Sequence, residues 1–373
     1  MKVAYLVLSW FFGIIFGLLA LSMLLTKNWL QAIALLLIVL LLLPPLAGLV
    51  QSILGRAIPV WIRVVSIVVL LAIFVALMNI NQPSSIYKSP EIEARFMEMY
   101  DARLEAWPVA YQSVFVDTSY GKIHVIISGP EDAPPVLLLH ASGVAGWSWI
   151  YNVEELSKHY RTYAIDTLGD AGKSVLYDLD TYPPDGPAQS ALITELTEKL
   201  GIGRADVVGA SEGGFIGTNY ALYAPERVQK LILLGPMGYA GTNASILRIM
   251  LAQFYPLKPV QESTFRWAFG DDPRLNEGFG EWFRLLMAGV FPRKARPTLF
   301  TPEQLQGLDV PVLLVLGKKD KLVGDPENAK MQAQDIPDLR VEILDSGHLI
   351  GAEQPEQVNS IIIEFLGVQD TQP

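Results

Sequence analysis

Residues 208–214 of this 373-residue chain have the sequence Val208-Gly209-Ala210-Ser211-Glu212-Gly213-Gly214. They begin inside an apolar run at 206–210 and end inside a helical pattern at 212–223. The heptapeptide fits G-x-S-x-G, in which a serine occupies a sharp strand-to-helix turn. Side chains at 209 or 213 would crowd that turn, and the helix start directs N–H groups toward any oxyanion that forms. The alternative is a glycine-rich turn that contains a serine by coincidence.

The first 80 residues are strongly apolar and contain no acidic residue. Their only charged residues are Lys2, Lys27, Arg56 and Arg63. Uncharged runs at 3–25 and 29–50 are each long enough to cross a bilayer as a helix, and a run at 64–80 is at the short limit. We therefore expect a transmembrane region at 1–80 with three spans, and a lipid bilayer as a partner. A cleaved signal peptide is disfavoured, because the first run is long, lacks an A-x-A site and is followed at once by a second run.

The remaining 293 residues carry 24 basic and 38 acidic residues, a net charge of −14. This balance argues against nucleic acid or anionic lipid as the main ligand. The absence of cysteine excludes disulfides and cysteine-based metal sites. Four histidines without an H-E-x-x-H motif offer little for a zinc hydrolase. We expect neither a metal nor another cofactor.

Strands and helices alternate after a linker and short helix at 81–104. The expected strands are 113–116, 122–127, 135–139, 162–165, 206–208, 230–234, 310–316 and 340–344. The expected helices are 150–158, 188–200, 212–223, 326–334 and 355–366. The first two strands suit an antiparallel hairpin, and the others suit βαβ units in a mostly parallel sheet. This domain is expected to cover 105–367, followed by a tail at 368–373.

The alternation stops between residues 237 and 302. This stretch is helical in pattern and rich in large apolar residues, for example at 246–254 and 279–291. It suits a cap over a pocket, and it is equally compatible with additional packed core.

A serine hydroxyl is a weak nucleophile and needs a histidine base oriented by an acid. His348 lies in a loop after the last expected strand, where catalytic groups gather in open α/β sheets. Asp320 follows the preceding strand and is the candidate acid, whereas Asp345 shares a tight loop with His348 and is a poorer partner. His124 in a strand and His159 at a helix end are expected to be structural.

An oxyanion hole needs two N–H donors. One is expected from the backbone of Glu212, directly after the nucleophile. The other is expected from Ser142, in the loop after the third strand, with His140 shaping that loop without transferring protons. The Glu212 carboxylate is unusual beside an oxyanion hole, and we expect it to face solvent or the cap, or to pair with a cation.

Several further motifs accompany these residues. They are His140-Ala141-Ser142-Gly143 with Trp147, Asp166-Thr167-Leu168-Gly169-Asp170-Ala171-Gly172-Lys173-Ser174, Gly317-Lys318-Lys319-Asp320 and Ser346-Gly347-His348. With the serine turn, they make residues 105–367 resemble the α/β-hydrolase superfamily and its bacterial serine carboxylesterases. The resemblance implies a mostly parallel eight-stranded sheet with flanking helices and a helical cap. A serine nucleophile is unlike the aspartate of dehalogenases and epoxide hydrolases in that superfamily, and Ala141 replaces the usual glycine of the loop.

The expected function is a membrane-anchored serine hydrolase that cleaves lipophilic carboxylic esters through an acyl-enzyme. Amide, thioester or carbon–carbon bond hydrolysis on the same triad is an alternative, and a non-catalytic receptor or complex subunit is another. The basic residues tie in number across three spans, with Lys2, Arg56 and Arg63 on one side and Lys27, Lys88 and Arg95 on the catalytic side. The two arginines in a short loop favour an extracytoplasmic catalytic domain at the cell membrane.

Overall fold

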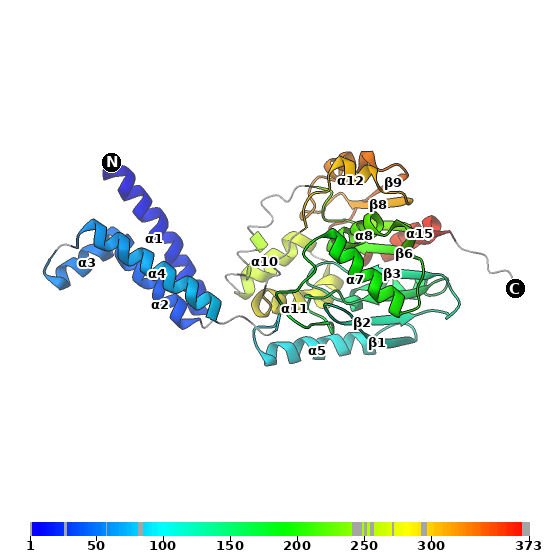
Figure 1. Ribbon diagram of the computed structural model, residues 1–373, viewed down its shortest axis with the longest axis horizontal. Coiled ribbons are helices and arrows are strands. Elements are labelled where there is room, and N and C mark those ends of the chain that lie inside the picture. The colour runs from blue at the N-terminus through cyan, green and yellow to red at the C-terminus, as the bar shows by residue number, and fades with distance from the viewer. Residues whose placement is uncertain are drawn as a thin grey trace. The chain divides into compact units, whose positions relative to one another are not determined.

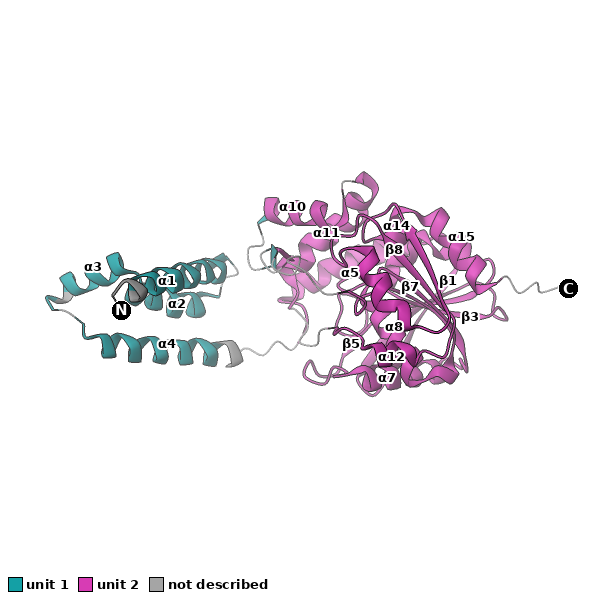
Figure 2. Ribbon diagram, turned by 90° about the horizontal axis from the view of Figure 1, so that it is seen from above, with its two compact units in different colours: residues 1–83, 250–257 teal, residues 84–249, 258–373 magenta. Residues whose placement is uncertain are grey.

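The computed structural model describes residues 2–25, 28–56, 58–80, 85–240, 248–249, 252–253, 257–270, 272–291 and 297–367. Contacts divide the chain into two compact units (Figure 2), residues 1–83 with 250–257 and residues 84–249 with 258–373. The expected tail at 368–373 and most of the expected helix at 246–254 lie outside the described residues.

The N-terminal unit is helical (Figure 1). Its helices are α1 (Lys2–Leu25), α2 (Trp29–Leu42), α3 (Pro44–Leu54) and α4 (Val60–Ile80). Ala20, Leu35 and Ile38 are fully buried and form the centre of this unit. The segments Leu6–Leu25 and Val60–Leu77 are each long and apolar enough to cross a membrane. The third expected span is therefore a continuous helix, and it begins four residues before the expected residue 64.

The second expected span, 29–50, is not one continuous helix. The α2 and α3 helices meet at an angle of 89°, so they count as a single span only if the bent pair is taken together. Leu43 is extended because a following proline disfavours the helical conformation. Pro45 has no N–H to donate to the carbonyl of Leu41, four residues earlier. The guanidinium Nε of Arg63 donates to that carbonyl instead, at 3.1 Å.

The second unit is built on a nine-stranded sheet with the order β1-β2-β4-β3-β6-β7-β8-β9, with β5 paired to β2. The strands are β1 (Tyr111–Asp117), β2 (Gly121–Ser128), β3 (Pro135–Leu139), β4 (Arg161–Ile165), β5 (Val175–Leu176), β6 (Ala205–Ala210), β7 (Val228–Leu234), β8 (Val312–Gly317) and β9 (Leu339–Leu344). The strand β2 pairs antiparallel with its neighbours, and the pairs from β4 to β9 are parallel. All eight expected strands are present, and the two-residue β5 is an addition too short to predict from sequence.

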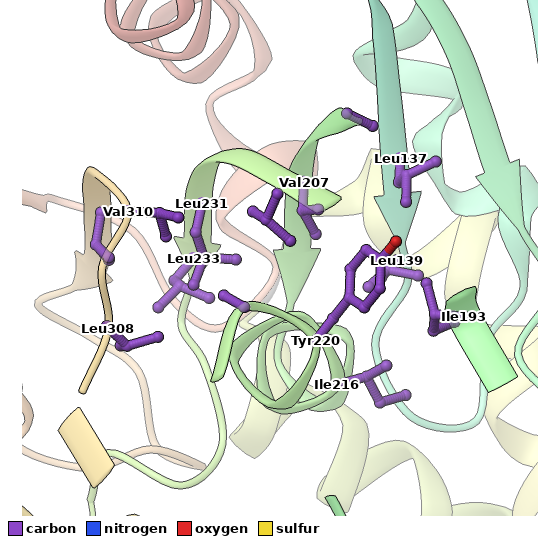
Figure 3. Close-up of a cluster of buried hydrophobic side chains, with 14 of the residues drawn as sticks. Leu137, Leu139, Ile193, Val207, Ile216, Tyr220, Leu231, Leu233, Leu308 and Val310 are labelled. Carbon is purple, nitrogen blue, oxygen red and sulfur yellow. The ribbon is translucent and has the colours of Figure 1, made fainter. Parts of the chain in front are cut away.

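The core of this unit lies between the sheet and its helices (Figure 3). The Tyr220 ring of the helix α8 (Glu212–Tyr223) lies beside Leu139 of β3, and Ile216 of the same helix belongs to the same buried cluster. The strand β8, which has a neighbouring strand on both sides, is buried along its whole length. Burial on both faces explains why it is a continuous apolar run rather than an alternating one.

The remaining elements flank the sheet or form the cap. They are η1 (Gly146–Tyr151), α6 (Val153–Leu156), α7 (Gly186–Lys199), η2 (Pro225–Arg227), α12 (Pro302–Gln306), α13 (Pro326–Gln332), η3 (Ala333–Asp335), α14 (Ile350–Glu353) and α15 (Pro355–Leu366). The region expected to be helical contains α10 (Lys258–Phe269), which lies between the two example segments, and α11 (Pro273–Gly289), which begins before the expected residue 279. The helix α5 (Pro90–Glu105) packs against α11.

Candidate active site

Ser211 occupies the turn between β6 and α8. Its φ of 50° makes it the single non-glycine residue with positive φ among those described. The Ser211 N–H donates to the carbonyl of Leu234 at 2.9 Å, and the Ser211 carbonyl accepts from Met237 at 3.0 Å. A Cβ atom at Gly213 would lie 2.1 Å from the carbonyl oxygen of Leu139, so this position needs glycine. The surrounding backbone therefore holds the serine in a conformation that it would not adopt by itself.

His348 and Asp320 form a buried pair at the ends of β9 and β8. Nδ1 of His348 donates to Oδ2 of Asp320 at 2.7 Å, and the two side chains are 4% and 2% exposed. The other carboxylate oxygen of Asp320 accepts from the N–H groups of Leu322 and Val323, at 2.8 and 2.9 Å. These bonds fix the carboxylate. Because Nδ1 of His348 is bonded to Asp320, Nε2 is the ring nitrogen left to exchange a proton. Asp345 is exposed and pairs with Lys319 at 3.0 Å, so it does not compete for His348.

The electrostatics of this pair favour the charged forms. Burial alone would lower the pKa of His348, but the carboxylates of Asp320 and Glu353 outweigh it and raise that pKa above its usual value. Burial also opposes ionisation of Asp320, yet His348 and the two backbone donors bring the pKa of Asp320 below its usual value. A positive charge that develops on His348 is therefore stabilised where it forms.

Glu353 is a residue of this site that the sequence reasoning missed. Its carboxylate accepts from the N–H of Gly347 at 2.6 Å and from the N–H of Leu349 at 3.1 Å. It thereby fixes the backbone on both sides of His348, and burial raises the pKa of Glu353. An acidic residue just after a histidine-bearing loop is a weak sequence signal, since such residues are common in short helices.

The loop after β3, residues 140–143 (the oxyanion loop), contains Ser142, the expected second donor of the oxyanion hole. Nε2 of His140 accepts from the N–H of Thr167 at 3.0 Å, so Nδ1 carries the proton and donates to the carbonyl of Ala141 at 2.8 Å. The N–H of Gly143 donates to Asp170 at 2.9 Å. The close approach of Leu139 to Gly213 brings the start of this loop against the serine turn.

Ser211 and His348 line one half-open pocket with a cavity volume of about 50 Å³. Its wall is largely apolar and includes Phe279 from α11. The oxyanion loop contributes Ala141 to the wall. Ser142 is exposed, whereas the Glu212 side chain is 7% exposed. Of the orientations expected for Glu212, the solvent-facing one is wrong, because the side chain is buried at the start of α8, whereas the cap-facing and cation-paired ones stay predictions.

His124 is fully buried in a second hydrogen-bonded cluster, away from this pocket. Its Nδ1 lies 3.1 Å from Oδ2 of Asp166, and its Nε2 lies 2.7 Å from Oγ of Ser113. The hydroxyl of Tyr100 donates to Asp166 at 2.9 Å. His159 is exposed. Of the four histidines, His348 is the one that lines the pocket with Ser211.

Comparisons with known proteins agree with this geometry. Residues 136–361 match the model of a family described as "Alpha/beta hydrolase family". The carboxylesterase nap of Bacillus subtilis (strain 168) is 30% identical over 302 residues, which cover 78% of this chain and 98% of that protein. The crystal structure of naproxen esterase from Bacillus subtilis has a TM-score of 0.70 and 29% identity, over 75% of this chain and all of that one. The human monoacylglycerol lipase ABHD6 is 26% identical over 64% of this chain and 76% of its own length.

Proposed function

The chain belongs to the alpha/beta hydrolase family, and from this premise we propose that it is a membrane-anchored serine carboxylesterase acting on lipophilic esters. Two relatives that are 30% identical and match 78% and 76% of the chain are named carboxylesterases. Ester hydrolysis is therefore the activity that best fits the family and the pocket together.

One observation carries the proposal. A serine in a strained strand-to-helix turn shares a pocket with a histidine that is hydrogen-bonded, at 2.7 Å, to a buried aspartate. This combination supports Ser211 as nucleophile, His348 as base and Asp320 as orienting acid. A purely structural histidine–aspartate pair has no need of a serine held at positive φ beside it.

The proposed reaction has two halves. Nε2 of His348 removes the proton from Oγ of Ser211 while Oγ attacks the ester carbonyl carbon, and His348 then gives that proton to the departing alkoxide. In the second half, His348 removes a proton from water, the hydroxide attacks the acyl-serine, and the proton returns to Oγ as the acid leaves. The ring orientation set by Asp320 keeps Nε2 available in both halves.

The tetrahedral intermediates carry a negative oxygen, for which backbone N–H groups of Ser142 and Glu212 are the proposed donors. Glu212 is the first residue of α8, where helical N–H groups have no intrahelical acceptor. The contact of the oxyanion loop with the serine turn supports Ser142 as the second donor.

The proposed preference for lipophilic esters rests on the pocket wall. Val144, Trp149, Leu234, Phe279 and Ile350 are among its lining residues. Such a wall favours transfer of an apolar acyl or alcohol group from water. A relative named monoacylglycerol lipase is consistent with this preference.

The test of function combines labelling with a substrate series. We expect a fluorophosphonate probe to label the full-length protein and Ser211→Ala to remove the label. A series of p-nitrophenyl esters from two to twelve acyl carbons should show turnover that rises above acetate, in contrast to matched amides and thioesters. Labelling that survives Ser211→Ala would refute the assigned nucleophile, and a lack of turnover of every ester would refute the activity.

We also propose that the catalytic unit is extracytoplasmic. Arg56 precedes α4, and Arg63 lies in its first turn. The catalytic unit follows α4, so a single crossing by α4 would separate the two arginines from the catalytic unit. Basic residues in short loops favour the cytoplasmic side. This argument is independent of whether the bent α2–α3 pair crosses the membrane.

The chain has no cysteine, which permits a direct test with single cysteines. Glu131→Cys is at an exposed position of the catalytic unit, and Ser52→Cys is at an exposed position of α3. In intact cells, a membrane-impermeant maleimide should label the first variant and not the second. The reverse labelling pattern would overturn the proposed orientation.

A further inference from the structure

The oxyanion loop is held through three successive peptide planes. His140 donates to the carbonyl of Ala141, which belongs to the peptide that carries the N–H of Ser142. Asp170 accepts from the N–H of Gly143 in the next peptide. In the third, Nε1 of Trp282 donates to the carbonyl of Gly143 at 2.8 Å, in a fully buried bond. Because a peptide group is planar, holding the Ala141 carbonyl orients the N–H of Ser142 in the same peptide, and the bonds to the next two peptides restrict the backbone torsions beside it.

The third of these bonds comes from the cap helix α11 rather than from the sheet. Trp282 is 1% exposed, so its N–H has no access to water as an alternative acceptor. Gly143 has a φ of +76°, and a Cβ atom there would lie 2.5 Å from Leu286, also on α11. The cap helix therefore contacts the oxyanion loop both by a hydrogen bond and by close packing.

Trp282 is in turn held by α5. The Arg103 guanidinium lies 5.2 Å from the Trp282 ring and 4.2 Å from the Trp147 ring. It also donates to the carbonyl of Met99 at 2.8 Å and to that of Gly278 on the cap helix. Phe96 packs edge-on against Trp282, with centroids 4.7 Å apart.

Contacts with the middle and the C-terminal end of α11 extend this attachment. Arg95 pairs with Glu281 at 2.8 Å. Near the C-terminal end of α11, Nζ of Lys88 donates to the carbonyl of Ala288 at 2.9 Å. The segment from 85 to 105 thus contacts α11 from Gly278 to its C-terminal end, and in sequence it directly follows the N-terminal apolar helices.

We propose that Trp282 is a positioning residue for the oxyanion hole, and that Arg103 of α5 acts through Trp282. This inference rests on the proposed function of the Ser211 site. It assigns the segment 85–105 to the catalytic apparatus, a role beyond connecting the N-terminal unit to the sheet. It also predicts that the effect of these residues appears in the chemical step rather than in substrate binding, because the oxyanion forms after binding.

The decisive variant is Trp282→Phe, and the chain offers a matched control. Trp147 lies 5.0 Å from Trp282 in the same aromatic cluster, and its Nε1 is buried without a hydrogen-bond partner among the described residues. Trp147→Phe removes the same atoms without removing a bond to the oxyanion loop. In the full-length protein we expect Trp282→Phe to lower kcat by about tenfold with KM unchanged, and Trp147→Phe to stay within about twofold.

A transition-state analogue provides a second readout. A trifluoromethyl ketone that forms a tetrahedral adduct with Ser211 should bind Trp282→Phe more weakly by the factor lost in kcat/KM. Melting temperatures of the two tryptophan variants should be similar. Equal kcat values for the two variants, or a loss in KM alone, would overturn the inference.

The role of Arg103 is tested by a double-mutant cycle. Arg103→Met should lower kcat in the parent protein but have little further effect in Trp282→Phe, because the residue acts through the tryptophan. Arg103→Lys keeps a cation over the rings and should restore part of the loss in kcat. This variant also tests the role of Arg103 if Arg103→Met folds poorly. Additive losses in kcat would overturn the coupling. Loss of labelling in Ser211→Ala with full activity in Trp282→Phe would refute this inference while leaving the proposed function intact.

Discussion

Two sets of serine, histidine and aspartate lie in the same unit: Ser211, His348 and Asp320 at the pocket, and Ser113, His124 and Asp166 in the hydrogen-bonded cluster around His124. In each set an aspartate oxygen lies near Nδ1 of a histidine, at 2.7 Å in the first and 3.1 Å in the second. In the second set the serine hydroxyl also lies beside the ring, with Oγ 2.7 Å from Nε2 of His124.

The two serines differ in their surroundings. Ser113 lies in the middle of the extended strand β1, opposite Ile126, and is exposed. Ser211 has positive φ, precedes a helix and lines a pocket. A strand offers its N–H groups to the neighbouring strand, whereas a helix start offers them to a developing oxyanion.

The two aspartates differ as well. Asp166 also accepts from the N–H groups of Gly146 and Lys173, at 2.7 and 2.8 Å, and from Tyr100. It therefore joins four separate segments and acts as a structural centre. We therefore expect that a hydrogen-bonded serine, histidine and aspartate do not by themselves make a catalytic site. The backbone conformation at the serine and the donors beside it distinguish a reaction site from a structural cluster.

The largest expected effect separates the two serines. Ser211→Ala should lower kcat/KM by about 10⁴-fold or more, because the nucleophile is lost. Ser113→Ala should stay within about twofold, because its hydroxyl has no part in the reaction. Steady-state hydrolysis of a p-nitrophenyl ester measures both. A comparable loss in Ser113→Ala would break the distinction.

The next effect separates the two aspartates. Asp320→Asn should lower kcat by about 10³- to 10⁴-fold, since an amide cannot hold the required tautomer of His348. Asp166→Asn should instead reduce the free energy of unfolding by about 3 kcal/mol, because several buried donors lose a charged acceptor. Urea unfolding and kcat are measured for both variants. If both variants lost mainly kcat, or both lost mainly stability, the assigned roles of the two aspartates would be contradicted.

A smaller effect assigns the pH dependence to His348. Activity needs neutral His348 and is lost as the pH falls through its pKa, which the Asp320 and Glu353 carboxylates raise. Glu353→Gln removes one of these charges, so the acid limb of kcat/KM should move to lower pH. Asp345→Asn is the control, since Asp345 is exposed and paired with Lys319. An acid limb that stays in place in Glu353→Gln would count against His348 as the titrating base.

The smallest effect concerns the second cluster alone. Tyr100→Phe removes a hydroxyl that lies 2.9 Å from Asp166 and 3.1 Å from His124. We expect a loss of about 1–2 kcal/mol in the free energy of unfolding, with kcat unchanged. Chemical denaturation and steady-state kinetics measure the two quantities. A selective loss of kcat would show that the second cluster takes part in the reaction.

Much of the fold followed from the sequence because its signals are local. Apolar runs bounded by glycine and polar residues marked the eight main strands, and the serine turn has a sequence pattern of its own. The positions of Asp320 and His348 after successive strands placed them at one edge of a parallel sheet, where the structure has them within 2.7 Å. Their catalytic roles remain predictions.

The parts that were missed depend on contacts between distant segments. Nothing near Trp282 indicates that its N–H meets a carbonyl 139 residues earlier in the chain. Glu353 looks like any acidic residue of a short helix. The break at Leu43 is different, because Pro44 and Pro45 are visible in the sequence, and a reading of hydropathy alone passed over them.

The conformation of Ser211 has a consequence for the stability of the whole protein. A non-glycine residue held at such a φ costs about 1–3 kcal/mol, whereas glycine adopts the same conformation without a steric penalty. A glycine at position 211 would therefore give an inactive protein that resists unfolding better than the active one. Mutation and selection for stability alone would remove the nucleophile, so its persistence in a lineage depends on a continuing demand for the reaction.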